Sequence, residues 1–305
     1  MATATLRDYR LQPDEPAPDG VRRVARGQID LARDELAGDG HKDIGDAVHE
    51  ARKAFKRVRA LVRLARDELG DEAYRRENET FRDAGRALSG VRDAAVLVAT
   101  LDDVIARHGD ELADGRFGAL RDALADEART AHEAIEDDRG AIEGVLVTLG
   151  RARDRVAGWP LPEDDDDVAI LAPGFRRIYR RGRRALRAAE ADTSTEHLHE
   201  LRKRAKDLWH AAQVVRPAAP RKLKKLGRRA HRLSDAVGED HDLAVLLDAA
   251  RQRPHTLASG ELELLETLVG RRRAQLQGAA LKRGRKVYAR KPRKLAKLIR
   301  GVPSR

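Results

Sequence analysis

Apolar residues recur every three or four positions along almost the whole chain, and the alternation typical of strands is absent. This spacing places apolar side chains on one face of an α-helix. In the first half, the pattern and its glycine stops predict helices over about 20–38, 44–69, 71–89, 93–107, 115–139 and 140–156. The pattern resumes at Phe175 and continues to the end, with breaks at 193–195, 217–220, 254 and 292. The sequence therefore predicts an all-α protein.

The chain contains an internal repeat with an offset of about 150 residues. The segment VHEARKAFKRVR at 48–59 aligns with LHELRKRAKDLW at 198–209. Shorter similarities flank both copies in the same order, since 21–24 resembles 175–178 and 92–96 resembles 241–245. Because order and spacing both hold, we infer that one helical unit was duplicated. Two copies of such a bundle are expected to pack about a pseudo-two-fold axis.

A segment rich in Pro and Asp separates the two copies. AGWPLPEDDDDVAILAPG at 157–174 carries three prolines and an acidic run, which is typical of a solvated linker. We therefore divide the chain into an N-terminal extension (1–19), a first helical repeat (20–157), a linker (158–174) and a second helical repeat (175–305).

Each copy of the repeat forms a helix with one basic face. At about 100° per residue, basic side chains gather on one side of the first helix and apolar side chains on the other. The first stripe consists of His49, Arg52, Lys53, Lys56, Arg59 and Arg63, opposite Ala51, Phe55, Val58, Val62 and Ala65. The second stripe consists of His199, Arg202, Lys203, Lys206 and His210, opposite Leu201, Ala205, Leu208, Ala212 and Val215.

The overall charge is strongly asymmetric. Residues 1–167 hold 27 Lys and Arg against 38 Asp and Glu, a net charge of −11, whereas residues 168–305 hold 35 against 13, a net charge of +22. A half-chain of that charge attracts polyanions. A solvated, highly charged helical surface accounts for the mixture of charges, but it accounts poorly for the excess of 22.

The spacing of the cations favours a linear anion. Basic side chains one helical turn apart repel one another, and a polymer with many negative groups relieves that repulsion better than a single phosphate. Arg presents a planar fork to phosphate oxygens, Lys a mobile point charge, and His a donor whose charge responds to pH near neutrality. The alternative is that acidic neighbours such as Glu50 and Asp207 neutralise the stripes.

Other chemistry has little support in the sequence. The chain has no Cys, and His49-Glu50 is followed by Lys53 where a zinc-binding HExxH motif needs His. We expect Asp240 and Asp242 to cap a helix that begins near Leu243, rather than to bind a metal. The acidic run at 163–167 is expected to be solvated. Glu50 and Glu200 project off the basic face, so no cluster of carboxylates is predicted there. We therefore expect no enzyme activity, no metal and no cofactor.

The duplicated motif HExRKxxK, each time followed by a helix opening near an Asp in RDAAV or HDLAV, resembles the CHAD family, the conserved histidine α-helical domain. The resemblance covers about 20–295, and GRKVYARKP at 284–292 is similar to the family's ending. It implies two tandem four-helix bundles related by a pseudo-two-fold axis, with a shared basic groove or pore that binds inorganic polyphosphate. The family pattern also carries basic residues on the preceding helices.

Carried over residue by residue, the implied polyphosphate-binding residues are His49, Arg52, Lys53, Lys56, Arg59, His199, Arg202, Lys203, Lys206, Arg22, Arg26, Arg176 and Arg180. Asp207 and Trp209 depart from the family pattern, where basic residues are common. Lys224, Lys225 and Arg228 are candidates to extend the second stripe at that end.

Two other functions stay open at this point. A nucleic-acid-binding protein would use the same basic surface, but single-strand binders also need aromatic platforms, and Trp209 is the one aromatic residue beside the stripes. A polyphosphate or triphosphate hydrolase is less well supported. Glu261-Leu262-Glu263 has the ExE of an ExExK motif, but Leu265 stands where Lys is required. With no secretory signal or membrane span evident, we expect a cytoplasmic protein associated with polyphosphate granules.

Overall fold

The computed structural model describes residues 8–299 except 14, 39–42, 89, 110–111, 114, 138 and 163–166. The first half forms α2 (Ala17–Ala37), α3 (Ile44–Leu64), α4 (Arg66–Ala87), α5 (Gly90–Arg107), α6 (Gly118–Asp137), α7 (Arg139–Arg155) and the 3₁₀ turns η2 (Val156–Gly158) and η3 (Val168–Leu171). The second half forms α8 (Ala172–Ala191), α9 (Thr195–Val214), η4 (Arg216–Ala218), α10 (Pro220–Arg251), η5 (Pro254–Thr256), α11 (Glu261–Val287) and α12 (Pro292–Ala296). The described residues contain no strand, which confirms the all-α prediction.

Two predicted helix boundaries were wrong. The expected helix over 44–69 ends at Leu64, although Gly70 does leave helical geometry, with a φ of +72°, inside α4. No helix begins near Leu243, because α10 is continuous from Pro220 to Arg251. Asp240 is buried in the middle of α10 and accepts hydrogen bonds from Arg273 and Gln277 of α11. Asp240 thus forms an ion pair with Arg273 of α11 instead of capping a helix as the local sequence had indicated.

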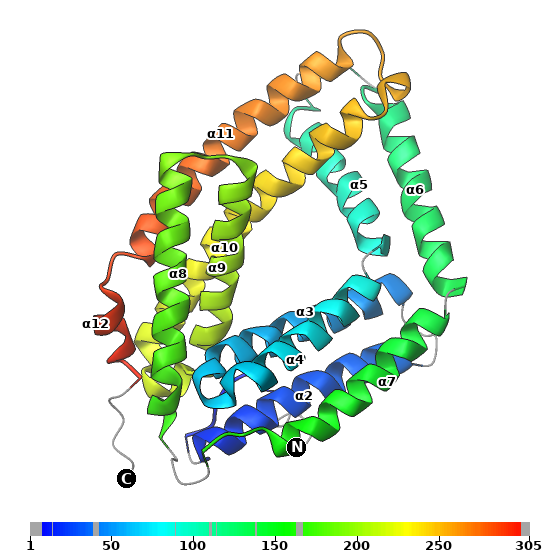
Figure 1. The fold of residues 1–305 in the computed structure, drawn as a ribbon. Coiled ribbons are helices and arrows are strands. Elements are labelled where there is room, and N and C mark those ends of the chain that lie inside the picture. Colours follow the sequence, from blue (N-terminus) through cyan, green and yellow to red (C-terminus); the bar gives the residue numbers. More distant parts are fainter. Residues whose placement is uncertain are drawn as a thin grey trace.

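The packing partners of the helices repeat along with the sequence. Helix α2 packs on α3 as α8 packs on α9, and α2 packs on α7 as α8 packs on α12. Helix α3 packs on α4, and α5 on α6, whereas in the second half α9 and α11 both pack on the single long helix α10. Figure 1 shows these groups as the sides of an open frame, with α2, α3, α4 and α7 along one side and α5 and α6 along another. The pseudo-two-fold relation between the halves stays a prediction.

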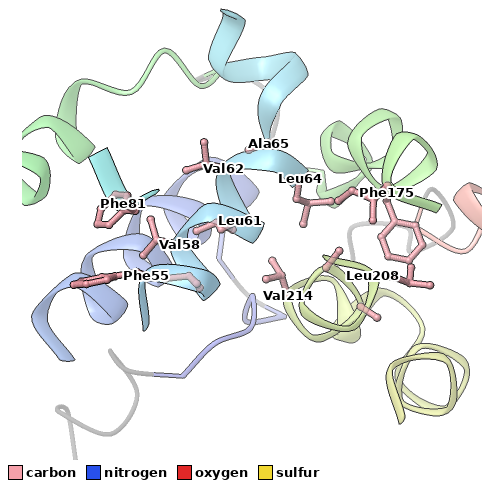
Figure 2. Close-up of a cluster of buried hydrophobic side chains, with 14 of the residues drawn as sticks. Phe55, Val58, Leu61, Val62, Leu64, Ala65, Phe81, Phe175, Leu208 and Val214 are labelled. Atoms are coloured by element: carbon pink, nitrogen blue, oxygen red, sulfur yellow. The ribbon is translucent and has the colours of Figure 1, made fainter. Parts of the chain in front are cut away.

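The hydrophobic interior consists of two clusters, and each takes side chains from both halves. The larger cluster joins α2, α3, α4 and α7 to α8, α9 and the first half of α10. Figure 2 shows part of it, with Leu64 of α3 beside Phe175 of α8 and Leu61 facing Val214 of α9. The smaller cluster joins α5 and α6 to the second half of α10 and to α11. The halves are thus held together by shared apolar cores.

The predicted linker is partly built into the larger cluster. Trp159 and Leu161 are buried, and so are Ile170 and Leu171, and all four belong to the larger cluster. Asp167 caps the turn η3 by accepting from the backbone N–H of Ala169. The remaining acids, 163–166, lie outside the described residues. No helix in the described part of the chain is long and apolar enough to cross a membrane.

Candidate functional site

The two helices that carry the stripes contact each other. Helix α3 begins at a cap in which Asp43 accepts from the backbone N–H of Asp46, and α9 at one in which Ser194 accepts from that of His197. Such caps fix where each helix starts, and so which face it presents. The apolar faces predicted for both helices are buried, from Ala51 to Ala65 on α3 and from Leu201 to Val215 on α9. The basic residues of both stripes, apart from the buried His210, therefore lie on the sides left over by the core.

Most cations of the first stripe already have partners. The Arg52 guanidinium donates to the carbonyl of Leu88 at 2.9 Å, and Arg59 donates to the Asn78 side chain at 3.2 Å. Lys53 forms an ion pair with Glu50 at 2.7 Å, one turn along α3. The long Lys53 side chain reaches across to Glu50, so an acidic neighbour neutralises this part of the first stripe, as the alternative from sequence allowed. His49 is half-buried and Lys56 is exposed.

The second stripe divides into a covered part and an exposed part. The His199 ring lies 4.8 Å from the ring of His241 on α10. Arg202 packs against Gly238 and lies 3.8 Å from Asp242, and a side chain at Gly238 would meet the guanidinium at 3.0 Å. Lys203 is exposed to solvent. The covered residues are thus held against α10, and Lys203 is open to a ligand.

Burial changes the protonation expected of the second stripe. It lowers the pKa of His199 to about 4, with a further lowering by the neighbouring Lys203. Burial also lowers the pKa of His241. His199 is therefore neutral near pH 7, and the expectation of a charge that responds to pH near neutrality was wrong for this residue. His210 is buried between Tyr9 and Trp209, and burial lowers its pKa to about 3.

A cavity of about 310 Å³ lies at the covered end of the second stripe. Arg202 and Lys206 of α9 line it, together with residues of α5, α10 and α11. The acidic lining residues are Asp103, Asp235, Glu239 and Asp242. Glu239 forms ion pairs with Arg272 at 2.7 Å and Arg107 at 3.3 Å. The cavity is therefore lined by both cations and carboxylates. In this part of the second stripe, acidic neighbours neutralise the basic side chains, which is the alternative raised in the sequence analysis.

A cluster of arginines around one buried carboxylate joins α3 to α9. Asp207 accepts from Arg63 of α3 at 3.0 Å and from Arg204 of α9 at 2.7 Å. Arg63 also shares the Asn78 side chain with Arg59. Burial lowers the pKa of Arg59 to about 10, and nearby Arg63 lowers it further. Burial and then Arg204 lower the pKa of Arg181 on α8. We call Arg59, Arg63, Arg181, Arg204 and Asp207 the junction cluster.

Arg181 and Arg204 were missed by the sequence analysis. On the helical projection Arg204 falls outside the second stripe, and the position that matches Arg181 in the first copy is Gly27. The available signal was the pair Arg204 and Asp207, three residues apart on one helix, which is the spacing of an intrahelical ion pair. That signal does not show that Asp207 also pairs with Arg63, which is 144 residues away in the chain.

The residues predicted on neighbouring helices are dispersed. Arg22 of α2 donates to the carbonyl of Trp159 and pairs with Asp19, so it is tied to the end of α7. Arg26 and Arg176 are half-buried, and Arg180 is exposed on α8. The three predicted residues of α10, Lys224, Lys225 and Arg228, are all exposed. The structure thus brings α3 and α9 together and spreads the other predicted cations over α2, α8 and α10.

A family model and one similar solved structure carry the same domain name. The model of the CHAD domain matches residues 23–251. PptA from Streptomyces chartreusis is similar in structure, with a TM-score of 0.62 at 17% sequence identity over 90% of this chain and 100% of that one. The CHAD domain from the plant Ricinus communis has a TM-score of 0.60 at 18% identity over 92% of this chain and 94% of that one. No curated protein matches the chain.

Proposed function

The chain belongs to the CHAD domain family, and from this premise we propose that it binds inorganic polyphosphate without hydrolysing it. The observation that carries the proposal is the contact between α3 and α9, the two helices with the repeated basic stripes. The Arg63–Asp207 pair at 3.0 Å links them directly. A linear anion can therefore meet cations from both copies of the repeat without any rearrangement of the core.

The positions of the cations suit phosphate groups. Exposed Lys56 and Lys203 offer mobile ammonium groups, and Arg52 and Arg59 offer guanidinium forks held by Leu88 and Asn78. Side chains held in this way lose little further conformational freedom when a ligand arrives, which favours binding.

A non-catalytic role is part of the proposal. The two carboxylates of the repeated motif are engaged in ion pairs along their own helices, Glu50 with Lys53 and Glu200 with Arg204 at 2.8 Å. Neither is poised as a general base over the stripe. We therefore expect incubation of polyphosphate with the protein and Mg²⁺ or Mn²⁺ to release no phosphate above a blank.

Polyphosphate is favoured over nucleic acid by the state of Trp209. Its ring stacks on His231 at 3.9 Å and on His210 at 4.6 Å, so the aromatic side chain that the sequence offered as a platform already has ring partners. Stacking on an aromatic side chain contributes about 1–3 kcal/mol per base in single-strand binders. With that ring already stacked, we expect nucleic acid to rely mainly on its phosphate contacts.

The experiment that tests the proposal is a competition at physiological salt. Labelled long-chain polyphosphate is bound to the protein and displaced with unlabelled polyphosphate, single-stranded DNA or duplex DNA, at equal concentrations of phosphate. We expect unlabelled polyphosphate to compete most strongly. Equal or stronger displacement by either nucleic acid would overturn the proposal. In cells, the proposal places the protein on polyphosphate granules in the cytoplasm.

A further inference from the structure

The first four turns of α10 carry a dense row of cations with no acid among them. Residues 220–234 contain no Asp or Glu. The α10 cationic face consists of Arg221, Lys222, Lys224, Lys225, Arg228, Arg229 and Arg232, all of which are exposed. On a helix of about 100° per residue they fall within one arc of roughly 160°. The opposite side, with Leu223 and Ala230, is buried against α9.

These seven side chains differ from the stripes in having no partner among the described residues. None of them forms an ion pair or a side-chain hydrogen bond there, whereas Arg52, Lys53 and Arg59 of the first stripe all do. The face ends where α10 turns acidic, at Asp235 and Glu239 beside the cavity. Unneutralised charge in the second half is therefore concentrated on this face more than on the second stripe.

The arrangement opposes the stability of the helix. The N-terminus of a helix carries a partial positive charge and disfavours cations, yet Arg221, Lys222 and Lys224 occupy the first turns. Ala219 at the N-cap provides no side-chain acceptor. Like charges four residues apart, such as Arg221 with Lys225 and Arg228 with Arg232, repel each other. A sequence that keeps such unfavourable pairs is best explained by a ligand that neutralises them.

The face adjoins the second stripe. Trp209 of α9 stacks on His231 of α10, and Gly227 lies within 3.7 Å of Trp209 if a Cβ is placed on it. Lys206, one turn before Trp209, lines the same cavity as Ser234 and Asp235, the residues that follow the face. The α10 cationic face therefore lies beside the stretch of α9 that carries Lys206 and Trp209, where a polymer can pass from α9 to α10.

We propose that the α10 cationic face is a second anchor for the same polymer, so that the ligand of this protein is long-chain rather than short-chain polyphosphate. The inference rests on the proposed function. From Arg221 to Arg232 the face is about 16 Å long, at 1.5 Å per residue. A chain that fills the stripes and continues onto α10 gains contacts within one molecule, and a chain too short to reach both surfaces gains none.

The test measures the binding of tripolyphosphate and of a polymer of about 100 phosphates to two variants with equal loss of charge. The first variant changes Arg221, Lys225, Arg228 and Arg232 to Gln. The matched control changes four exposed cations of α11 without described partners, Arg271, Lys282, Arg283 and Lys286, to Gln. Because the changes on α10 relieve repulsion between like charges, we expect the melting temperature of that variant to be no lower than that of the unchanged protein. This measurement is the control for correct folding.

We expect the α10 variant to bind the long polymer on the order of 100-fold more weakly at 0.15 M salt, with a salt slope less steep by about 3, as four lost phosphate contacts require. Its affinity for tripolyphosphate and the long-chain affinity of the control should change much less. If the α10 variant loses no more long-chain affinity than the control, the second anchor is wrong while polyphosphate binding stands. If the unchanged protein binds neither ligand, the proposed function itself fails.

Discussion

Replacement of Asp207 by Asn tests whether the junction cluster joins the halves as the structure indicates. Asp207 is 7% exposed and is the shared carboxylate between Arg63 and Arg204. The change keeps the shape and one acceptor but removes the only negative charge of the junction cluster. Removing one partner of a buried pair costs about 3–5 kcal/mol, and since both arginines remain partly exposed we expect about 3 kcal/mol. For 305 residues, at about 2.1 cal/mol/K of unfolding entropy per residue, that is a fall in melting temperature of roughly 5 °C.

The assay is thermal unfolding followed by circular dichroism, with and without polyphosphate. Asp83→Asn is the matched control, because Asp83 pairs with Arg82 on the exposed side of α4, and its loss should leave the melting temperature unchanged. We expect polyphosphate to raise the melting temperature of Asp207→Asn more than that of the unchanged protein, since the polymer supplies the missing negative charge. An Asp207→Asn protein that melts with the control would refute the junction argument.

Three further predictions follow from the packing, the buried histidines and the stripe. Gly174→Ala is expected to destabilise the protein by about 1–3 kcal/mol in denaturant titrations, because the new Cβ would lie 1.7 Å from the carbonyl oxygen of Leu64. Unchanged stability would mean that α8 and α3 are not this close. The folded-state pKa of His210, about 3, lies below its unfolded value of 6.5, so the unfolded state binds more protons between these pH values and the protein becomes less stable as the pH drops from 6.5 toward 3. His210→Gln should flatten that part of the pH–stability curve, and an equally steep curve would argue against a buried neutral imidazole. Changing Arg52, Lys53 and Lys56 to Ala should raise the dissociation rate of polyphosphate in surface-based kinetics and leave the association rate nearly constant, because association depends on the electrostatic field of the whole second half of the chain. A slower association with an unchanged dissociation rate would exclude direct contact with the first stripe.

The sequence was sufficient to predict the helices and their buried faces. The apolar positions of α3 and α9 have a strict helical period, and that period is set by local geometry, so Phe55, Val58, Leu201 and Leu208 were all placed correctly in the core. The continuity of α10 was not predictable in the same way. Asp240 has the local features of a cap, but in the fold its carboxylate accepts from Arg273 and Gln277, more than thirty residues away, and the helix continues through it.

The electrostatic state of the site also depended on distant partners. From sequence, Arg202 and Lys206 are equivalent to the cations of the first stripe, but in the fold they face Asp235 and Asp242 across a cavity. The packing of α9 on α10 partly buries His199, and this burial lowers its pKa to about 4. A helical projection shows which residues share a face, and the neighbouring helix decides how much charge that face retains.

The most direct test of polyphosphate binding through the basic surface is a calorimetric titration with long-chain polyphosphate over a series of salt concentrations. If about six phosphates are contacted, with a slope of roughly −0.7 per contact, log K should fall with log salt at a slope near −4, and affinity should drop roughly 10²- to 10³-fold between 50 and 200 mM salt. Binding that is absent at low salt, or that does not weaken as salt rises, would contradict the account.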